Sequence, residues 1–146
     1  MIIMKFGGTS LEDARAMTNV MEIVTGEQWR KPIVVLSALA GTTNSLLRSA
    51  EKAMEGDLDK AHSELNSLLE RHVLLLENLI DNRSDVQHLI LTIRKRFEEL
   101  KTLCQGIAIL GELTNRSLDA VASVGEQLST MIFARALAER GHAVEL

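Results

Sequence analysis

The feature that most constrains the fold is an apolar segment near the amino terminus that contains two adjacent glycines and continues into an amphipathic pattern. It reads IIMKFGGTS from its second residue onward. The apolar residues suit a buried parallel strand, and Gly7 and Gly8 allow a tight turn in which a ligand can approach the backbone. Ser10 can cap the helix that follows, with Asp13 three residues further on, so this helix should begin at Ser10 or Leu11. The segment therefore predicts a strand, a turn and a helix, in that order.

The predicted turn offers a place for an anion. The start of a helix presents free N–H groups and the positive end of the helix dipole, and Lys5 adds a mobile charge just before the turn. The glycine spacing matches neither the Walker sequence GxxxxGK[ST] nor the dinucleotide fingerprint GxGxxG. A Gly-Gly pair between a strand and a helix is also a common tight connection without any ligand. On spacing alone, phosphate binding and a purely structural turn are both open.

A second strand, turn and helix follow. Residues 32–37 are typical of a strand, and residues 38–44 form the connection into a helix. Two parallel strands separated by a helix imply a right-handed crossover, so both turns should lie at the carboxyl edge of the sheet, where open α/β sheets bind ligands. Ser37, Thr42 and Thr43 would then place hydroxyl groups beside the first turn. A simpler interpretation is that Thr42 or Thr43 caps the helix.

Residues 57–110 interrupt this alternation with two long helical patterns and no strand signal. Their apolar residues recur at alternating steps of three and four, which predicts a coiled-coil seam, and the polar turn at residues 81–84 should fold the two helices into an antiparallel hairpin. The expected facing pairs are Leu79 with Val86, Leu75 with Ile90, His72 with Ile93, Leu68 with Phe97, Leu65 with Leu100, Ala61 with Cys104, and Leu58 with Ile107.

The two hairpin helices should differ in burial. The first carries a second apolar stripe, so it should be the inner helix, packed on the α/β body or on a second subunit. The second should show its charged residues to solvent. His72, the one polar residue of the seam, is expected to set the register or to be partly exposed. The stripe is Leu69, Val73, Leu76 and Ile80, and the charged residues are Lys95, Arg96, Glu98, Glu99 and Lys101.

The remaining residues predict one more helix and one more strand. The helix covers residues 114–140, but Gly125 inside it should bend or break it. Glu126 would then stand at a new helix start, where the dipole favours a carboxylate; alternatively, Glu126 faces the cleft and receives a ligand's ammonium group. Gly141 should close the helix, and residues 142–146 should begin a third strand.

Composition narrows the classes of function. The chain has 146 residues, 46% of them hydrophobic, which is enough for one domain with its own core. A net charge of -4 and only four aromatic residues argue against a nucleic-acid surface, and no apolar run approaches the ~20 residues that span a bilayer. The single Cys104 and the lack of an apolar leader after Met1 fit the cytoplasm. The four histidines lack metal-ligand spacing, so we expect no metal site.

Three motifs together resemble one family. They are KFGGTS after the first strand, SALAGTTN after the second, and LGELT followed by LDAVASVGE in the last helical region. In this order they resemble aspartate kinase. The resemblance covers the whole chain but matches only the amino-terminal part of the amino-acid kinase domain. It implies an incomplete α/β domain at residues 1–146, with a partial, open and mostly parallel sheet, flanking helices, and the helical excursion at residues 57–110.

The resemblance also implies an activity. Aspartate kinases transfer the γ-phosphoryl group of ATP, with Mg²⁺, to the β-carboxylate of L-aspartate. The product, 4-phospho-L-aspartate, is the first intermediate toward lysine, threonine and methionine. By resemblance, Lys5 stabilises charge on the transferring group and the backbone of the first turn holds its oxygens, while three further residues bind aspartate. The phosphate residues are Lys5, Gly7, Gly8, Thr9 and Ser10, and the aspartate residues are Ser37, Thr43 and Glu126.

Rival interpretations concern what this chain does by itself. The family's ATP-binding half and its arginine for the substrate's α-carboxylate would lie beyond Leu146, so the isolated chain should have little or no activity. A folded, non-catalytic fragment that serves ligand binding or subunit assembly is the main alternative. The nucleotide-binding half of an oxidoreductase is disfavoured. Such a fold carries an acidic residue that binds ribose at the end of the second strand, and this chain has Ser37 there. The expected partners are L-aspartate, ATP and further copies of the chain in a homo-oligomer.

Overall fold

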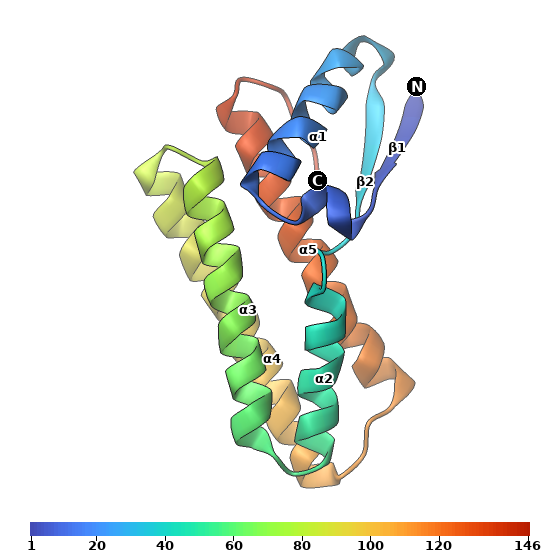
Figure 1. Cartoon of the computed structure of the whole chain (residues 1–146), viewed down its shortest axis with the longest axis vertical. Coiled ribbons are helices and arrows are strands. Elements are labelled where there is room, and N and C mark those ends of the chain that lie inside the picture. The colour runs from blue at the N-terminus through green and yellow to red at the C-terminus, as the bar shows by residue number, and fades with distance from the viewer.

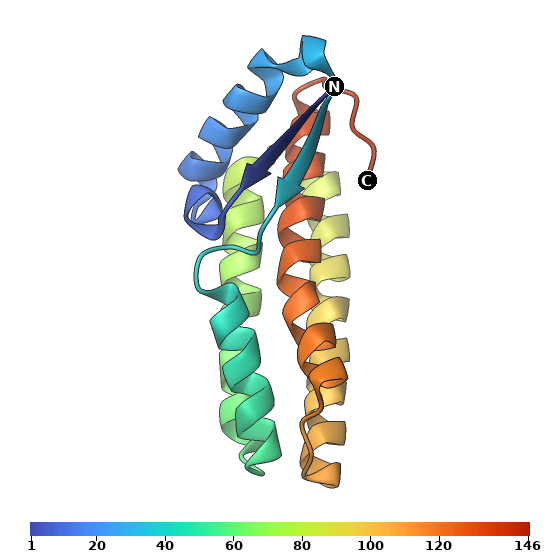
Figure 2. The same ribbon diagram turned by 90° about the vertical axis from the view of Figure 1, so that its right-hand side faces the viewer.

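Two parallel strands and five α-helices make up the fold, which is known from a computed structural model that describes residues 1–146. The strands lie at one end of the molecule, and long helices run away from them (Figures 1 and 2). This arrangement confirms the expected α/β fold with flanking helices. In chain order the elements are β1 (Ile2–Phe6), η1 (Gly8–Leu11), α1 (Ala14–Gly26), η2 (Gln28–Arg30), β2 (Pro32–Leu36), α2 (Thr42–Met54), α3 (Leu58–Leu79), α4 (Arg83–Leu110) and α5 (Asn115–Glu139), where η marks a short 3-10 helix.

The two strands pair in parallel along their whole length, from Ile2 opposite Pro32 to Phe6 opposite Leu36. Both therefore end at the same edge, as the crossover argument predicts. The expectation of a fully buried strand is wrong for one face of the sheet. Ile3 remains 71% exposed, because the helices cover only the opposite face, where the other strand residues join the core. Those inward residues are Met4, Phe6, Val34 and Leu36.

The first α-helix begins later than the sequence suggested. Residues Gly8–Leu11 form the 3-10 turn η1, and α1 starts at Ala14. Asp13, not Ser10, is the N-cap, and its carboxylate accepts a hydrogen bond from the Ala16 N–H at 2.8 Å. The extra turn lets Leu11 reach full burial in the core, which a helix starting at Ser10 would not guarantee. The positive end of the α1 dipole consequently lies beyond the glycines rather than at them.

The hairpin of α3 and α4 is antiparallel, as expected (Figure 1). Asn82 ends the connection and caps α4, since its side-chain oxygen accepts from the N–H groups of Ser84 and Asp85. The seam is buried apart from its half-buried ends, the second stripe on α3 is buried or half-buried, and the charged side of α4 is mostly exposed. These observations confirm α3 as the inner helix. The full set of facing pairs stays a prediction.

His72 is the one seam residue whose environment differs from the expectation of partial exposure. Its side chain is fully buried, and its ring centroid lies 5.8 Å from that of Phe97. Nδ1 donates to the Leu68 carbonyl at 2.7 Å, while Nε2 has no partner. Burial lowers the pKa of His72 from 6.5 to about 4, the Leu68 hydrogen bond opposes this, and the nearby Arg71 charge adds to it.

We expect His72→Leu to reduce the loss of stability on acidification. Because the folded-state pKa of about 4 lies below 6.5, the unfolded chain binds the proton first. The contribution of His72 is therefore complete above pH 6.5 and is lost as the pH falls toward about 4. At about pH 5 the free energy of unfolding of the wild type should have fallen by roughly 2 kcal/mol through this group, at about 1.36 kcal/mol per pKa unit. The variant should not show this fall.

Urea unfolding at about pH 7.5 and about pH 5 measures this difference. His88→Leu is the matched control, because His88 is exposed on α4 and its replacement should leave the wild-type pH dependence unchanged. An equal pH dependence of the free energy of unfolding in wild type and His72→Leu would contradict the lowered pKa of His72.

Helix α5 runs without a break through Gly125, so the predicted break and the new helix start at Glu126 are both wrong. The alternative of a bend at Gly125 stays a prediction. A Cβ atom on Gly125 would lie 2.9 Å from the Cβ of Ala38, 3.1 Å from Cγ2 of Thr42 and 3.3 Å from Cδ1 of Leu46. Glycine at this position therefore allows α5 to cross α2 and the preceding turn at very short range.

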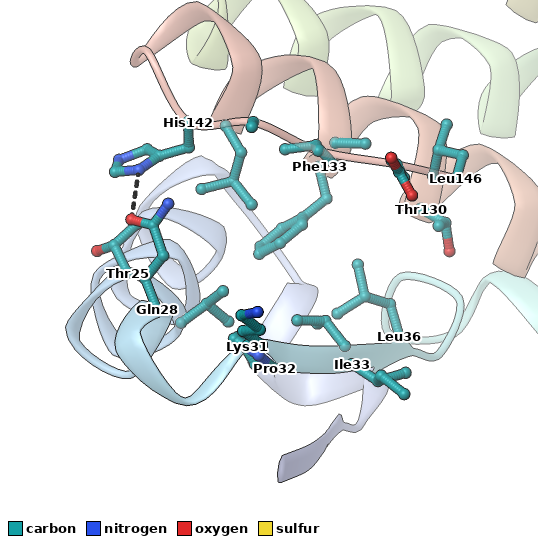
Figure 3. Close-up of a pocket in the computed structure, with 17 residues that line it drawn as sticks. Thr25, Gln28, Lys31, Pro32, Ile33, Leu36, Thr130, Phe133, His142 and Leu146 are labelled. Carbon is teal, nitrogen blue, oxygen red and sulfur yellow. Dashed lines mark hydrogen bonds between the residues drawn. The ribbon is translucent and has the colours of Figure 1, made fainter. Parts of the chain in front are cut away.

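The carboxyl-terminal residues do not form the third strand that the pattern indicated. Helix α5 ends at Glu139, and Gly141, with a positive φ of 85°, closes it as expected just after the C-cap Arg140. Residues 142–146 then run beside β2 without strand pairing and border a largely apolar cavity of about 810 Å³. Figure 3 shows Phe133 among its lining residues and the hydrogen bond between His142 and Gln28. No helix of the fold combines the length and hydropathy of a membrane-spanning segment.

Candidate functional site

The two turns that follow β1 and β2 touch each other at the carboxyl edge of the sheet. A Cβ atom on Gly8 would lie 3.0 Å from the Ala38 carbonyl oxygen and 3.3 Å from the Cα of Ala40. Gly8 is therefore required by the close approach of the two backbones. A Cβ atom on Gly7 would meet nothing within 4 Å, so the space beside Gly7 is open to a ligand. Gly8 thus has the structural role, and the binding interpretation of the turn stays a prediction at Gly7.

Lys5 lies directly before this turn, on the face of the sheet that the helices leave open. It is exposed and forms no ion pair, whereas many other charged residues of the chain are paired at their surfaces. Thr9 and Ser10 follow in η1 and are also exposed, with the Ser10 N–H donating to the Gly7 carbonyl at 3.1 Å. An unpaired cation and an open glycine backbone therefore stand at the same strand end.

The second turn is tied to α5 through Ser129, a residue that sequence reasoning missed. Its buried hydroxyl lies 2.7 Å from the Ser37 carbonyl oxygen and 3.0 Å from the Glu126 carbonyl oxygen. This shared contact brings the turn of α5 that carries Glu126 to the end of β2. The Glu126 side chain itself is exposed, so its carboxylate is available to a ligand. Ser37 and Glu126 thus meet although 89 positions separate them in the sequence.

Neither Thr42 nor Thr43 caps α2, contrary to the simpler interpretation. The N-cap is Gly41, with a φ of 77°, and no side chain caps the helix. Thr42 is buried with its methyl group against the position of Gly125, and its hydroxyl has no hydrogen-bond partner. Thr43 is only half-buried. The structure therefore separates the two residues, with Thr42 in the packing and Thr43 accessible from the surface near the site.

Arg71 of α3 is the second residue that sequence reasoning missed. Its Nη1 donates to the Ala40 carbonyl at 2.6 Å, and its Nη2 donates to the Glu12 carbonyl at 3.1 Å. Ala40 lies in the connection that follows β2, and Glu12 lies in the connection that follows β1. Arg71 is a polar position in the middle of the hairpin pattern, and its acceptors lie 31 and 59 positions away, so no local signal indicates the contact.

The predicted site residues therefore share one open edge and lie outside the apolar cavity beside the carboxyl terminus. That cavity is lined by residues of β2, α5 and the carboxyl terminus and includes none of the predicted site residues. Its lining is mainly apolar and contains no arrangement of charges suited to a phosphate. The chain also has no group of three or more histidine, cysteine or acidic side chains placed to hold a metal ion. The arrangement at the edge can bind an anion at Lys5 and Gly7 and an ammonium group at Glu126.

Comparisons with known proteins agree with the motifs. The model of the amino acid kinase family matches residues 1–145. Aspartokinase 3, chloroplastic, of Arabidopsis thaliana is 37% identical over 143 residues, which are 96% of this chain and 24% of that protein. Aspartokinase 1, chloroplastic, of the same organism is 40% identical over 134 residues, which are 90% of this chain and 22% of that protein. The chain spans about a quarter of the length of these curated relatives.

Solved structures show the same relationship. The crystal structure of E. coli aspartokinase III in complex with lysine and aspartate, in the T-state, matches with a TM-score of 0.80 and 28% identity, over 98% of this chain and 30% of that chain. The structure of that enzyme in complex with aspartate and ADP, in the R-state, matches with a TM-score of 0.72 and 28% identity, over 97% of this chain and 29% of that chain.

Proposed function

This chain belongs to the amino acid kinase family, and from that membership we propose that it is the amino-terminal, substrate-binding part of an aspartate kinase. The reaction is transfer of the γ-phosphoryl group of ATP to the β-carboxylate of L-aspartate, which yields 4-phospho-L-aspartate and ADP. The observation that carries the proposal is that the first two motifs and the Gly125–Glu126 end of the third, which are far apart in the sequence, meet at one sheet edge, through the contacts of Gly8, Gly125 and Ser129.

The residues at this edge have the chemistry that phosphoryl transfer requires. Such reactions depend on positioning and on neutralising the charge of the transferring group rather than on covalent chemistry by the protein. Lys5 supplies an unpaired positive charge, and the backbone at Gly7 and Gly8, with Thr9 and Ser10 beyond, surrounds the phosphate oxygens. The open space next to Gly7 fits this role.

The second turn and α5 supply the acceptor side of the proposed reaction. Ser37 and Thr43 contact L-aspartate, and the exposed Glu126 carboxylate receives its α-ammonium group. Ser129 supports this arrangement by joining the backbones at Ser37 and Glu126. The structures of E. coli aspartokinase III hold aspartate, and one of them also holds ADP, which is consistent with such a pair of substrates.

The wider biology of the protein belongs to the same proposal. Its product would enter lysine, threonine and methionine biosynthesis, and the protein would act in the cytoplasm as a homo-oligomer. Mg²⁺ would accompany ATP, because in kinases it binds through substrate phosphates, waters and one or two carboxylates. This chain has no group of three or more histidine, cysteine or acidic side chains placed to hold a metal ion, so its side chains would not supply a dedicated Mg²⁺ site.

The proposal is tested by ADP release from the full-length protein, supplied with ATP, Mg²⁺ and L-aspartate. ADP release should require L-aspartate and should be absent with L-asparagine, which lacks the β-carboxylate. Hydroxylamine should trap the acyl phosphate as a hydroxamate. Absence of both signals would instead favour a non-catalytic protein.

Glu126→Gln should raise the KM for L-aspartate by about 10- to 100-fold, as expected when a hydrogen bond between charged groups worth about 1.5–3 kcal/mol is lost. The KM for ATP should change little, because Glu126 faces the amino acid. Glu22→Gln is the matched control, since Glu22 is exposed on α1, away from the turns. An unchanged KM for L-aspartate would remove Glu126 from the site.

A further inference from the structure

Arg71 makes a bridge between the two connections that carry the site. Glu12 follows η1, and Ala40 lies in the turn between β2 and α2. One guanidinium donates to the main-chain carbonyl of each, at 3.1 Å and 2.6 Å. No other side chain in the structure hydrogen-bonds to both connections. Figure 2 shows α3 passing beside both of them. The bridge therefore links a long helix outside the sheet to the site's backbone.

The contact point of the bridge coincides with the closest approach of the two turns. Ala40 accepts from Arg71 and is also the residue whose Cα would lie 3.3 Å from a Cβ on Gly8. A change in the position of Ala40 therefore changes the distance between the second turn and the glycine turn. Because the turns carry different proposed substrates, this distance sets how donor and acceptor meet.

The anchor on the other side of the bridge lies in a packed part of the hairpin. Arg71 neighbours His72, which is fully buried in the hairpin seam against Phe97. The planar guanidinium offers several donors in a fixed fork, so it can hold two carbonyls at once. A lysine ammonium is a single point of charge on a flexible stem and cannot reproduce both contacts in one geometry.

We infer that Arg71 is a positioning residue that fixes the two substrate-carrying turns relative to each other from the helical hairpin. This inference rests on the proposed function, because it gives the turns their substrates. Removing the bridge leaves the residues of the site in place but lowers the fraction of molecules in which they are aligned. The apparent affinity for each substrate falls in proportion to that fraction.

The test compares Arg71→Ala and Arg71→Lys in the full-length protein with Arg48→Ala as matched control. Arg48 also connects α2 to α3, through Glu64 at 3.2 Å, but contacts neither turn. Hydrogen exchange followed by mass spectrometry reports on peptides that contain Ser10 and Thr42, whose N–H groups are bonded within the two turns. Exchange should become at least about tenfold faster in both Arg71 variants, because it follows the fraction of molecules with opened turns, and that fraction rises from a small value to most of the molecules when the aligned fraction falls tenfold; it should stay at the wild-type rate in the control.

Kinetics supply the second measurement. The KM values for L-aspartate and for ATP should both rise about tenfold in both Arg71 variants if the aligned fraction falls tenfold. Loss of folded protein would lower the maximal rate and leave KM unchanged, so that result would overturn the inference. Wild-type behaviour of Arg71→Lys would also overturn it, because charge alone would then suffice.

The two measurements separate this inference from the proposed function. Wild-type hydrogen-exchange rates in both turns of the Arg71 variants would overturn the role of Arg71, whether or not the protein phosphorylates L-aspartate. Faster exchange in a protein whose wild type does not phosphorylate L-aspartate would support the bridge and reject the proposed function. Faster exchange with unchanged KM values would show that the bridge does not position substrates.

Discussion

Lys5→Ala should lower the kcat of the full-length protein for L-aspartate phosphorylation by a factor of order 10² or more, as expected for the loss of a preorganised transition-state charge. Lys5 is exposed, has no ion-pair partner and stands two positions before Gly7, beside which the space is open. Within residues 1–146, no carboxylate neutralises its charge before the phosphoryl group arrives. Its interaction should therefore be strongest when negative charge develops on the transferring group.

The kinetic pattern distinguishes this role from simple binding. An interaction made mainly in the transition state lowers kcat and kcat/KM together, whereas uniform binding raises KM alone. The free energy of unfolding should change by less than about 0.5 kcal/mol, because the side chain lies at the surface. Lys95→Ala, which removes an exposed lysine of α4, should keep the wild-type kcat. A kcat of Lys5→Ala within about threefold of wild type would remove Lys5 from catalysis.

Gly125→Val should lower the free energy of unfolding by about 3 kcal/mol or prevent folding, because overpacking a filled interior costs about 1–3 kcal/mol and sometimes more. Its Cβ would lie 2.9 Å from the Cβ of Ala38, closer than real Cβ contacts, with Thr42 and Leu46 just beyond. These neighbours lie in the packing of α2 and its preceding turn. The valine can be accommodated only if α5 moves away from α2.

Alanine provides a matched pair of variants for this prediction. In a helix interior, replacing glycine by alanine normally stabilises by about 1 kcal/mol. Gly106→Ala in α4 should show that gain, because a Cβ there meets nothing within 4 Å. Gly125→Ala should destabilise instead. Both are measured by urea unfolding, and a stabilising Gly125→Ala would show that the short contact between α5 and α2 is absent in solution.

Movement of α5 should also affect the site. Ser129 lies one turn after Gly125 on the same helix and holds the Ser37 carbonyl at 2.7 Å. A displaced α5 stretches that hydrogen bond and carries Glu126 away from the second turn. Variants of Gly125 that still fold should therefore have a raised KM for L-aspartate as well as lower stability.

Much of this fold could be predicted from short-range patterns. The alternation of strand, glycine turn and helix near Lys5 and near Gly41 depends on neighbours in the chain, and the structure has both units. The seam of the hairpin repeats with the period of a helix, and its residues are buried as expected. The candidate site was likewise proposed from a local signal, because a cation and two glycines stand at one strand end.

The errors occurred where long-range packing overrides a local preference. Gly125 is a weak helix former, but the contact with Ala38 and α2 explains its presence in an unbroken helix. The start of α1 is delayed by the 3-10 turn η1, which carries the fully buried Leu11 into the core. Residues 142–146 have a strand-like pattern, yet a strand requires a paired neighbour, and none is bonded to them.

The sequence by itself determined the two strand, turn and helix units, the hairpin and the last helix, because periodicity, turn chemistry and motif spacing involve residues close together in the chain. Only the tertiary structure decided which face of the sheet is open, that Thr42 is buried while Thr43 is half-buried, and that Ser129 and Arg71 hydrogen-bond to the turns. The first two features are matters of packing, and the last depends on hydrogen bonds between residues 31 to 92 positions apart. Such contacts follow from how helices pack in space, for which a single sequence carries no local signal.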